Sequence, residues 1–215
     1  MTASLVNHRQ PQRSPGGGRN EAAVHSVPPA GHGAAKDSLR VVAPPVPLRL
    51  VPQPEGLLQI HTAPFRGSFA AVFSQALRTA GLGSRVLVSQ FLKGGVDQGV
   101  EGCLWLCGRL QWLRPATLLC LDGAADPQGA VDGEARLAVE AIWAYCRDQL
   151  LAGSVDLLVL DELGLAIQLG YLPAEEIIAT LERRPAHLDV ILTGPAMPPA
   201  LMEMADQVTE LRRGY

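Results

Sequence analysis

The stretch Leu157-Leu158-Val159-Leu160-Asp161-Glu162 is the most informative part of this 215-residue sequence. Its four apolar residues run directly into two carboxylates. Such a run is typical of a strand that is buried on both faces and holds acidic side chains at its tip. Acids in this position lie close to metal-bound phosphates in phosphate-binding α/β proteins. The alternative interpretation is that Asp161 caps the turn after the strand.

Short apolar runs of similar length occur along the chain and predict further buried strands. Helical patterns lie between them and begin or end at Ser, Gly or Pro. This alternation predicts right-handed βαβ units, and hence an α/β fold in which helices cover both faces of a mostly parallel sheet. The predicted strands are Leu57–His61, Arg85–Phe91, Thr117–Leu121, Asp156–Leu160 and Asp189–Thr193, and the predicted helices are Ser68–Ala80, Glu134–Leu151, Pro173–Arg184 and Pro198–Ala205.

Two segments suggest how side chains pack. We interpret Cys103–Cys107 as the packed face of a helix rather than as a ring-stacking platform formed with Trp112. The helix Glu134–Leu151 has a periodic apolar stripe that predicts its buried face. The stripe consists of Leu137, Ala138, Ala141, Ile142, Tyr145 and Leu150.

The predicted sheet also indicates where a ligand would bind. Ligands of open parallel sheets bind beyond the carboxyl ends of the strands. The segments His61–Ser68, Phe91–Gly95, Asp161–Leu165 and Thr193–Ala196 follow predicted strands. We therefore expect these four segments to lie at one edge of the sheet and to line the site.

Residues 1–54 differ in composition from the rest of the chain. They hold 9 of the 17 prolines and no Phe, Tyr or Trp. A segment this poor in large apolar side chains cannot offset the entropy cost of ordering it, so we predict a disordered tail. A transit peptide or a partner-binding arm are alternatives to a plain solvated tail. The folded domain is predicted to span residues 55–215.

Charge and cysteine content exclude some classes of function. Six basic and two acidic residues give the tail a formal charge of +4. Because the whole chain has a charge of −3, the rest of the chain carries −7, and Lys93 is its only lysine. An acidic domain of this kind argues against nucleic-acid binding.

Neither a signal peptide nor an apolar run of about 18 residues is present, which predicts a cytoplasmic protein that does not enter a membrane. Cys103 and Cys107 alone do not make a zinc site, so free thiols are the better interpretation.

The segments around the acidic strand end resemble one protein family. In order, spacing and residue type they are similar to the P-loop type of ATP:corrinoid adenosyltransferase, over about residues 57–95 and 134–213. The matching pieces are Val86–Gly94, Leu157–Glu162, Gly170–Ile178, Arg184–His187, Val190–Gly194 and Ala205–Leu211.

This resemblance implies a single P-loop NTPase-like (RecA-like) domain and a reaction. In the implied reaction a cobalt(I) corrinoid attacks the 5′ carbon of ATP, which releases triphosphate and forms a cobalt–carbon bond. Magnesium would be held by Asp161 and Glu162, directly or through water, and no catalytic base is assigned because cobalt(I) is itself the nucleophile. A homodimer is also implied. The implied nucleotide and phosphate ligands are Thr62, Arg66, Gly67, Ser68, Lys93, Thr193 and Gly194.

The chain departs from the family where the phosphate loop is expected. The family carries Thr-Gly-x-Gly-Lys-Gly-Lys-Thr-Thr, whereas this chain reads Thr62-Ala63-Pro64-Phe65-Arg66-Gly67-Ser68-Phe69-Ala70. Pro64 removes a backbone N–H, Phe65 adds bulk and the lysine is absent, so the Walker A loop is degenerate. Residues 121–129, in the corrin-facing segment, contain no aromatic side chain.

These departures leave several hypotheses open. The chain is either an adenosyltransferase whose activity is impaired or lost, or a non-catalytic scaffold or regulatory binding protein with a protein partner. A different nucleotide hydrolase or transferase ranks last. Arg66 and Lys93 are phosphate ligands or solvated side chains, and Ser68 is a helix cap or a metal ligand. Thr193 and Gly194 are ligands or simply a strand end and turn.

Overall fold

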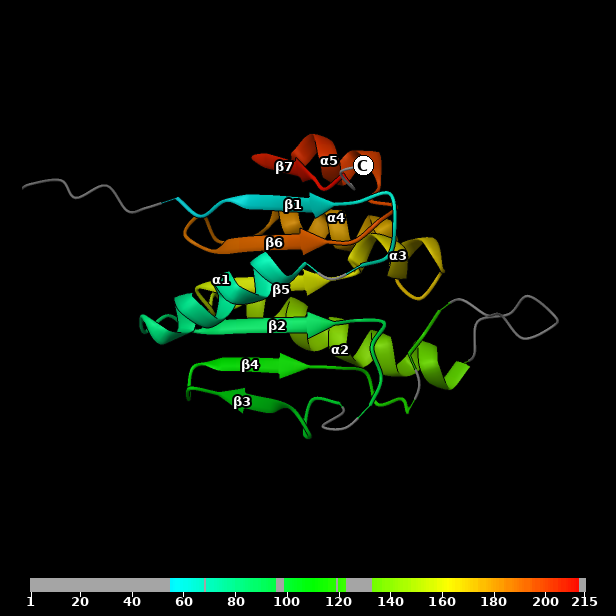
Figure 1. Ribbon diagram of the computed structural model, residues 1–215, viewed down its shortest axis with the longest axis horizontal. Helices are drawn as coiled ribbons and strands as arrows, with labels where there is room; N and C mark the ends of the chain where they lie inside the picture. Colours follow the sequence, from blue (N-terminus) through cyan, green and yellow to red (C-terminus); the bar gives the residue numbers. More distant parts are fainter. Residues whose placement is uncertain (1–54, 68, 96–98, 119, 123–132, 213–215) are drawn as a thin grey trace, which may run out of the picture. The chain divides into compact units, whose positions relative to one another are not determined.

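The computed structural model describes residues 55–67, 69–95, 99–118, 120–122 and 133–212 (Figure 1). The tail predicted for residues 1–54 lies outside this part of the chain, as does Ser68. None of the helices in the described part combines the length and the apolar composition needed to span a membrane.

The described residues form a seven-stranded sheet in the order β3-β4-β2-β5-β6-β1-β7. All neighbouring strands are parallel except β3, which pairs with β4 in the antiparallel direction. The predicted α/β fold with a mostly parallel sheet is confirmed. The strands are β1 (Leu58–Thr62), β2 (Val86–Gln90), β3 (Leu104–Leu106), β4 (Leu110–Leu113), β5 (Leu157–Asp161), β6 (Asp189–Thr193) and β7 (Gln207–Glu210).

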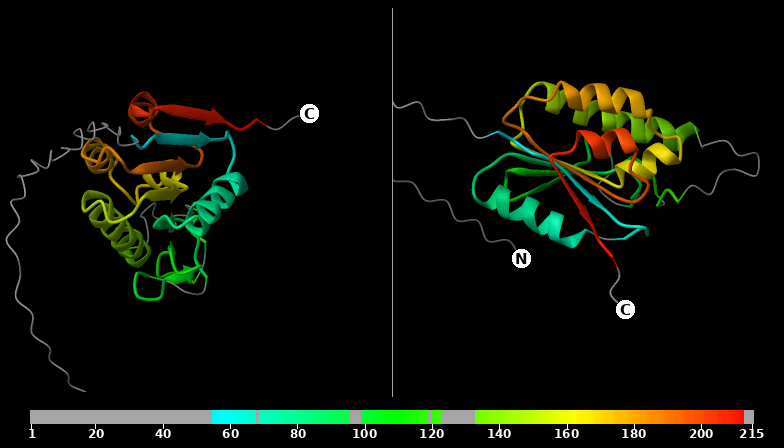
Figure 2. Two further views of the ribbon diagram at one scale, coloured as in Figure 1. Left: turned by 90° about the vertical axis from the view of Figure 1, so that its left-hand side faces the viewer. Right: turned by 90° about the horizontal axis from the view of Figure 1, so that it is seen from above.

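Helices cover both faces of this sheet, as predicted. Helix α1 lies on one face, whereas α2 and α4 lie on the other (Figure 2). The short helices α3 and α5 pack into the same core cluster as α2 and α4. The bounds are α1 (Ala70–Gly81), α2 (Gly133–Leu151), α3 (Leu163–Gln168), α4 (Ala174–Glu182) and α5 (Pro199–Met204).

Strand β5 shows why the central strands are apolar without alternation. Leu158 and Leu160 pack on the side of α2 and α4, while Leu157 and Val159 pack on the side of α1. Both faces of the strand are therefore buried, and each requires apolar side chains. The two core layers hold β5 in the middle of the sheet, so the position of its acidic end is fixed by packing.

The prediction of a strand at Thr117–Leu121 is wrong. Leu118 is 85% exposed, and the strand beside β2 is β4, Leu110–Leu113. The interpretation of Cys103–Cys107 as a helix face is also wrong, because this segment contains β3 and turns back into β4. Cys107 and Gly108 both have positive φ angles (44° and 67°), as a tight hairpin turn requires.

The buried face of α2 is rotated from the predicted stripe. Leu137 and Ala141 are exposed, while Ile142 and Leu150 are buried as predicted. Trp143 sets this rotation, because it is buried and its Nε1 donates a hydrogen bond to Glu176 of α4 at 2.9 Å. The residues of α2 that enter the core are Ala135, Val139, Ile142, Trp143, Cys146 and Leu150.

Candidate functional site

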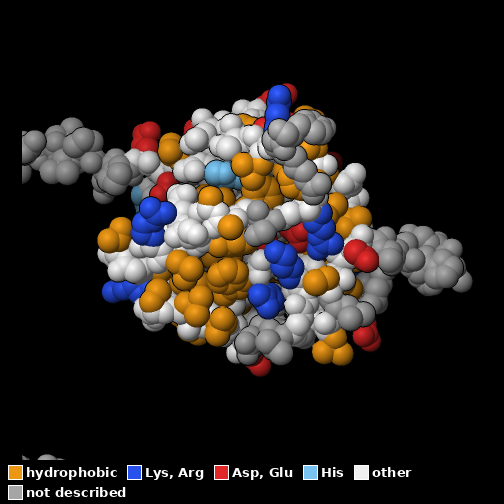
Figure 3. Space-filling view, in the orientation of Figure 1, with side chains coloured by type: hydrophobic (Ala, Val, Ile, Leu, Met, Phe, Trp, Pro, Cys, Tyr) orange, Lys and Arg blue, Asp and Glu red, His pale blue; other side chains and the backbone are white. Residues whose placement is uncertain are grey.

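The carboxyl ends of four parallel strands meet at one edge of the sheet. Gln90 of β2 pairs in register with Asp161 of β5, and His61 of β1 pairs with Thr193 of β6. Each of the four expected ligand segments follows one of these strands. The structure thus brings the ends of all four strands to the same edge, as predicted. In the space-filling view, basic side chains gather beside acidic ones where these strands end (Figure 3).

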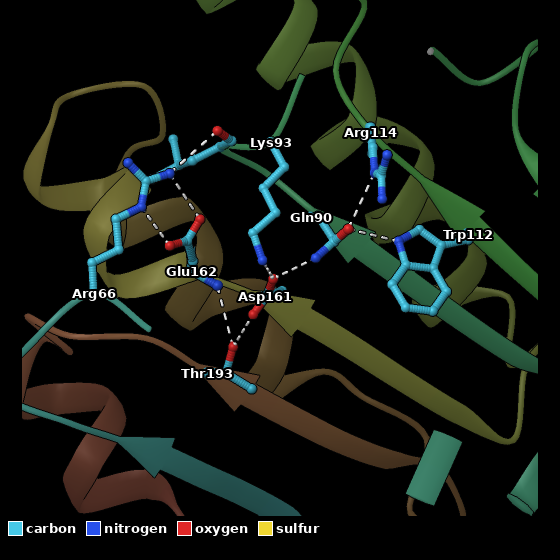
Figure 4. A network of polar contacts seen from close by, with 9 residues as sticks. Arg66, Gln90, Lys93, Trp112, Arg114, Asp161, Glu162 and Thr193 are labelled. Atoms are coloured by element: carbon cyan, nitrogen blue, oxygen red, sulfur yellow. Dashed lines mark hydrogen bonds and ion pairs between the residues drawn. The ribbon is translucent and has the colours of Figure 1, made fainter. Parts of the chain in front are cut away.

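Asp161 is fully buried at this edge and accepts hydrogen bonds on both of its oxygens (Figure 4). Thr193 Oγ1 donates to Oδ1 at 2.6 Å, and Gln90 Nε2 donates to Oδ2 at 2.9 Å. Lys93 Nζ lies 3.4 Å from Oδ2. The hydrogen bonds of the Asp161 side chain go to Thr193, Gln90 and Lys93, not to the backbone of the following turn. The capping interpretation of Asp161 is therefore wrong.

Gln90 connects Asp161 to the neighbouring strand. Its Oε1 accepts hydrogen bonds from Trp112 Nε1 at 2.9 Å and from Arg114 Nε at 3.1 Å. With two donors on Oε1, the amide nitrogen must face Asp161. The Trp112 ring packs against Phe73 of α1, at 5.2 Å between centroids. This network fixes the direction in which the Asp161 carboxylate points.

Glu162 binds Arg66 through both carboxylate oxygens. Arg66 Nε lies 2.6 Å from Oε1, and its terminal NH2 nitrogen lies 3.0 Å from Oε2. The same guanidinium donates to the carbonyl oxygens of Leu121 at 3.0 Å and Leu92 at 3.3 Å. Its hydrogen bond to Glu162 raises the pKa of Arg66 above its usual value. Arg66 therefore ties the loop after β1 to three other segments at the edge.

The backbone of Glu162 is strained and closely packed. Glu162 adopts a left-handed conformation with φ of 60°, and its N–H donates to Thr193 Oγ1 at 3.3 Å. Gly194 has a φ of 120°, and a Cβ at this position would lie 2.9 Å from the Glu162 Cα. A non-glycine residue in this conformation would be both strained and too close. Gly194 thus allows the ends of β5 and β6 to meet.

The remaining predicted ligands lie along the loop after β1. Thr62 ends the strand, and its carbonyl accepts a hydrogen bond from Leu211 N at 2.8 Å. Gly67 lies next to Phe65, whose ring would be 3.1 Å from a Cβ at position 67. Phe65 itself packs against the core cluster on the α1 side, so its bulk turns inward. Helix α1 begins at Ala70 with Phe69 as its N-cap.

The carboxylates of Asp161 and Glu162 are the candidate magnesium ligands. All four carboxylate oxygens of Asp161 and Glu162 already accept hydrogen bonds from protein donors. Among the described residues there is no group of three or more His, Cys, Asp or Glu that would hold a metal ion. Magnesium binds oxygen ligands directly at about 2.0–2.1 Å, so an ion at this distance would compete with Arg66 and Lys93 for the same carboxylate oxygens. The arrangement as it stands does not fit a metal.

Sequence analysis missed Trp112 and Arg114 as members of the site. Trp112 lies in β4 and Arg114 directly follows this strand. The apolar pattern did not reveal β4, so the proximity of these two side chains to Gln90 had no signal in the sequence. Lys93, Thr193 and the acid pair come together as the strand ends predicted. Arg66 is not a free surface side chain, because four of its five N–H groups donate to Glu162 and to two carbonyls, and 33% of the side chain is exposed.

Comparison with known proteins agrees with this geometry. The family model described as "ATP:corrinoid adenosyltransferase BtuR/CobO/CobP" matches residues 54–214. The chain belongs to this family. The family resemblance predicted from the motifs is thereby confirmed.

Three relatives of this chain are between 25% and 32% identical to it. The corrinoid adenosyltransferase of Escherichia coli (strain K12) is 31% identical over 161 residues, which cover 73% of this chain and 76% of the relative. The "Corrinoid adenosyltransferase CobA" of Salmonella typhimurium (strain LT2) is 32% identical with the same coverage. The "Uncharacterized protein all2391" of Nostoc sp. (strain PCC 7120) is 25% identical, over 73% of this chain and 44% of the relative.

Proposed function

We propose that this chain binds ATP and a cobalt corrinoid at the carboxyl edge of its sheet and transfers the adenosyl group from ATP to cobalt. The observation that carries the proposal is the position of Arg66. It comes from the loop after β1, where the family has its phosphate-binding lysines, and its guanidinium lies at Glu162. This positive charge at the edge of the sheet supports phosphate binding although the lysine is missing. Family membership supports both substrates.

The proposed reaction needs charge and position more than acid–base chemistry. The cobalt(I) electron pair attacks the 5′ carbon of ATP, so the cobalt–carbon bond forms as the carbon–oxygen bond breaks. The bonding pair leaves with the triphosphate. Because cobalt(I) is the nucleophile, the protein has to orient the two substrates, exclude water and stabilise the leaving charge.

Arg66 and Lys93 are the residues that would stabilise the leaving triphosphate. A guanidinium presents a planar fork of donors that suits phosphate oxygens, so it is a chemically sound replacement for a loop lysine. Lys93 Nζ lies over the ring of Phe73, 5.9 Å from its centroid, and beside Asp161. In this scheme Thr62, Gly67, Ser68, Thr193 and Gly194 contribute backbone or hydroxyl contacts to the nucleotide.

A second candidate function is a non-catalytic scaffold or regulatory binding protein. It is favoured by the hydrogen bonds of Arg66, which link the guanidinium to Glu162 and two carbonyls. A triphosphate would have to compete with these acceptors for the guanidinium. Pro64 in the same loop removes a backbone donor that would otherwise face phosphate.

Three further predictions from the sequence stay proposals. They are the homodimer, the cytoplasmic location and the division into a tail at residues 1–54 and a domain at residues 55–215. Sedimentation of the full chain tests the first, because a homodimer would have twice the 22.8 kDa mass of one chain.

The test of the function is a turnover assay on the full chain. Protein is mixed with ATP and chemically reduced cobalamin, with magnesium and again with EDTA, and formation of the light-sensitive cobalt–carbon bond is followed by absorbance. We expect wild-type protein to form product. Arg66→Gln and Lys93→Ala should each form it at least about tenfold more slowly, which corresponds to a loss of about 1.4 kcal/mol of transition-state stabilisation. Arg136→Gln, which removes a surface pair with Glu140, is the matched control and should leave the rate unchanged.

The two candidate functions give different outcomes in this assay. Wild-type protein that forms no product and gives no heat of ATP binding in calorimetry supports the scaffold. Product formed equally fast by wild type and by Arg66→Gln would keep the enzyme but remove Arg66 from its proposed role.

A further inference from the structure

We infer that Arg66 takes the place of a metal ion at this site, so that the chain holds its anionic ligand without magnesium. The identity of that ligand as ATP rests on the proposed function. The exclusion of the metal rests only on the contacts of Arg66, Lys93, Asp161 and Glu162.

The first step is the position of the guanidinium on Glu162. The carboxylate is almost completely buried, with 2% of the side chain exposed, and both of its oxygens bind Arg66 in a bidentate pair. Bidentate arginine–carboxylate pairs are short, strong and directional. The two carbonyl acceptors, Leu92 and Leu121, hold the other end of the guanidinium. The cation is therefore fixed by four contacts rather than loosely placed near the acid.

The second step is the charge of the whole cluster. Asp161 and Glu162 contribute two negative charges, and Lys93 and Arg66 contribute two positive charges at contact distance. A divalent cation would enter a group of side chains with no formal net charge and would face two neighbouring cations. Like charges at such distances disfavour binding strongly in a buried site. The cluster is thus already neutralised by the protein itself.

The third step concerns the ligand. When a metal neutralises the acids at a strand end, it also bridges them to the phosphates. Here the acids are neutralised by Arg66 and Lys93, so a phosphate group would contact these two side chains directly. Ligand affinity should then depend on Arg66 and be nearly the same with and without magnesium.

The test uses Mn2+ as the probe and needs neither nucleotide nor corrinoid. The free Mn2+ signal is measured by electron paramagnetic resonance during titration of the full-length protein. Wild-type protein should not reduce the signal at millimolar metal. Arg66→Gln frees the Glu162 carboxylate beside Asp161 and should raise Mn2+ affinity at least about tenfold, or about 1.4 kcal/mol. The double variant Arg66→Gln/Glu162→Gln should lose this gain.

Two controls separate metal exclusion from damage to the fold. Arg85→Gln breaks a different arginine–carboxylate pair, with Asp156 at 3.1 Å, and should leave Mn2+ binding as in wild type. Arg66→Lys keeps the positive charge but lacks the planar guanidinium, and it should bind Mn2+ more weakly than Arg66→Gln does. If Arg66→Gln does not fold, the wild-type titration still decides the matter, because Mn2+ binding by wild-type protein that Glu162→Gln abolishes would overturn the inference.

The inference is overturned if wild-type protein binds Mn2+ and Glu162→Gln abolishes that binding, or if folded Arg66→Gln shows no gain. A parallel calorimetric titration of ATP, in magnesium and in EDTA, should give wild-type affinities that agree within about twofold. Absence of ATP binding in both buffers would refute the proposed function while leaving the Mn2+ result intact, so the two failures are distinguishable.

Discussion

Replacement of Asp161 by Asn tests whether the buried network at the end of β5 is formed. The substitution keeps the shape of the side chain but removes its charge and turns one acceptor into a donor. If the new amide nitrogen faces Gln90, it opposes the Nε2 donor that now binds Asp161 at 2.9 Å. If the amide is flipped, Thr193 Oγ1 loses the acceptor that it now binds at 2.6 Å. One buried donor is therefore left without a partner in either orientation.

The cost follows from these contacts. A buried donor without a partner costs about 1–3 kcal/mol, and the remaining hydrogen bond loses the strengthening that a charged acceptor gives. Lys93 is 31% exposed and can turn to solvent, so its ion pair adds less than about 1 kcal/mol. We expect a loss of about 3 kcal/mol in the free energy of unfolding, which corresponds to a fall in Tm of about 6–12 °C.

Urea unfolding followed by tryptophan fluorescence measures this loss. The matched control is Asp156→Asn, which also removes a paired carboxylate, here one bound to Arg85, but at a side chain that is 41% exposed. The control should lose less than about 1 kcal/mol. Equal losses in the two variants, or an Asp161→Asn variant within about 0.5 kcal/mol of wild type, would refute the network described around Asp161.

Three further predictions concern other parts of the domain. Gly194→Ala should cost more than about 2 kcal/mol in urea unfolding, since it places a Cβ 2.9 Å from backbone, whereas Gly81→Ala has no atom within 4 Å and should not destabilise the protein. Burial raises the pKa of Cys146 to about 12, so this thiol should stay unreactive toward a disulfide reagent near pH 8 until urea unfolds the chain, while the exposed thiols react at once. The hydrogen bond from Arg85 lowers the pKa of Asp156 below 3.8, so its contribution to stability is present above that pH and is lost as the pH falls through the folded-state value. The difference in urea midpoint between wild type and Asp156→Asn should accordingly shrink between about pH 7 and about pH 3, and a constant difference would contradict the ion pair.

The sequence was sufficient to locate the central strands. Runs such as Leu157–Leu160 are apolar because both of their faces are buried, and this requirement is visible without coordinates. The ends of these strands then had to meet at one edge, because parallel strands that share a sheet end on the same side. The positions of Lys93, Asp161 and Thr193 followed from that rule alone.

Strand β4 could not be predicted in the same way. Leu110–Leu113 contains Gln111, whose buried amide oxygen is satisfied by Tyr145 of α2 at 2.9 Å, so a polar residue interrupts the apolar run. Thr117–Leu121 has a more strand-like composition, but its described residues 117, 118, 120 and 121 are not part of a strand. Apolar composition indicates the potential for burial, and only tertiary contacts decide which of two nearby runs is buried.

The pairing of Arg66 with Glu162 was also beyond the sequence. These residues are 96 positions apart, and their contact depends on the path of the loop after β1. Sequence analysis identified the missing lysine and the nearby arginine. It could not show that Arg66 also binds two carbonyl groups, which is the feature that distinguishes a fixed cation from a solvated one.

A calorimetric titration of ATP into the full-length protein tests the central claim most directly. We expect wild-type protein to bind ATP, and we expect Arg66→Gln and Lys93→Ala each to lose at least about tenfold in affinity while Arg136→Gln does not. No ATP binding by wild-type protein, or binding that is the same in all four proteins, would contradict it.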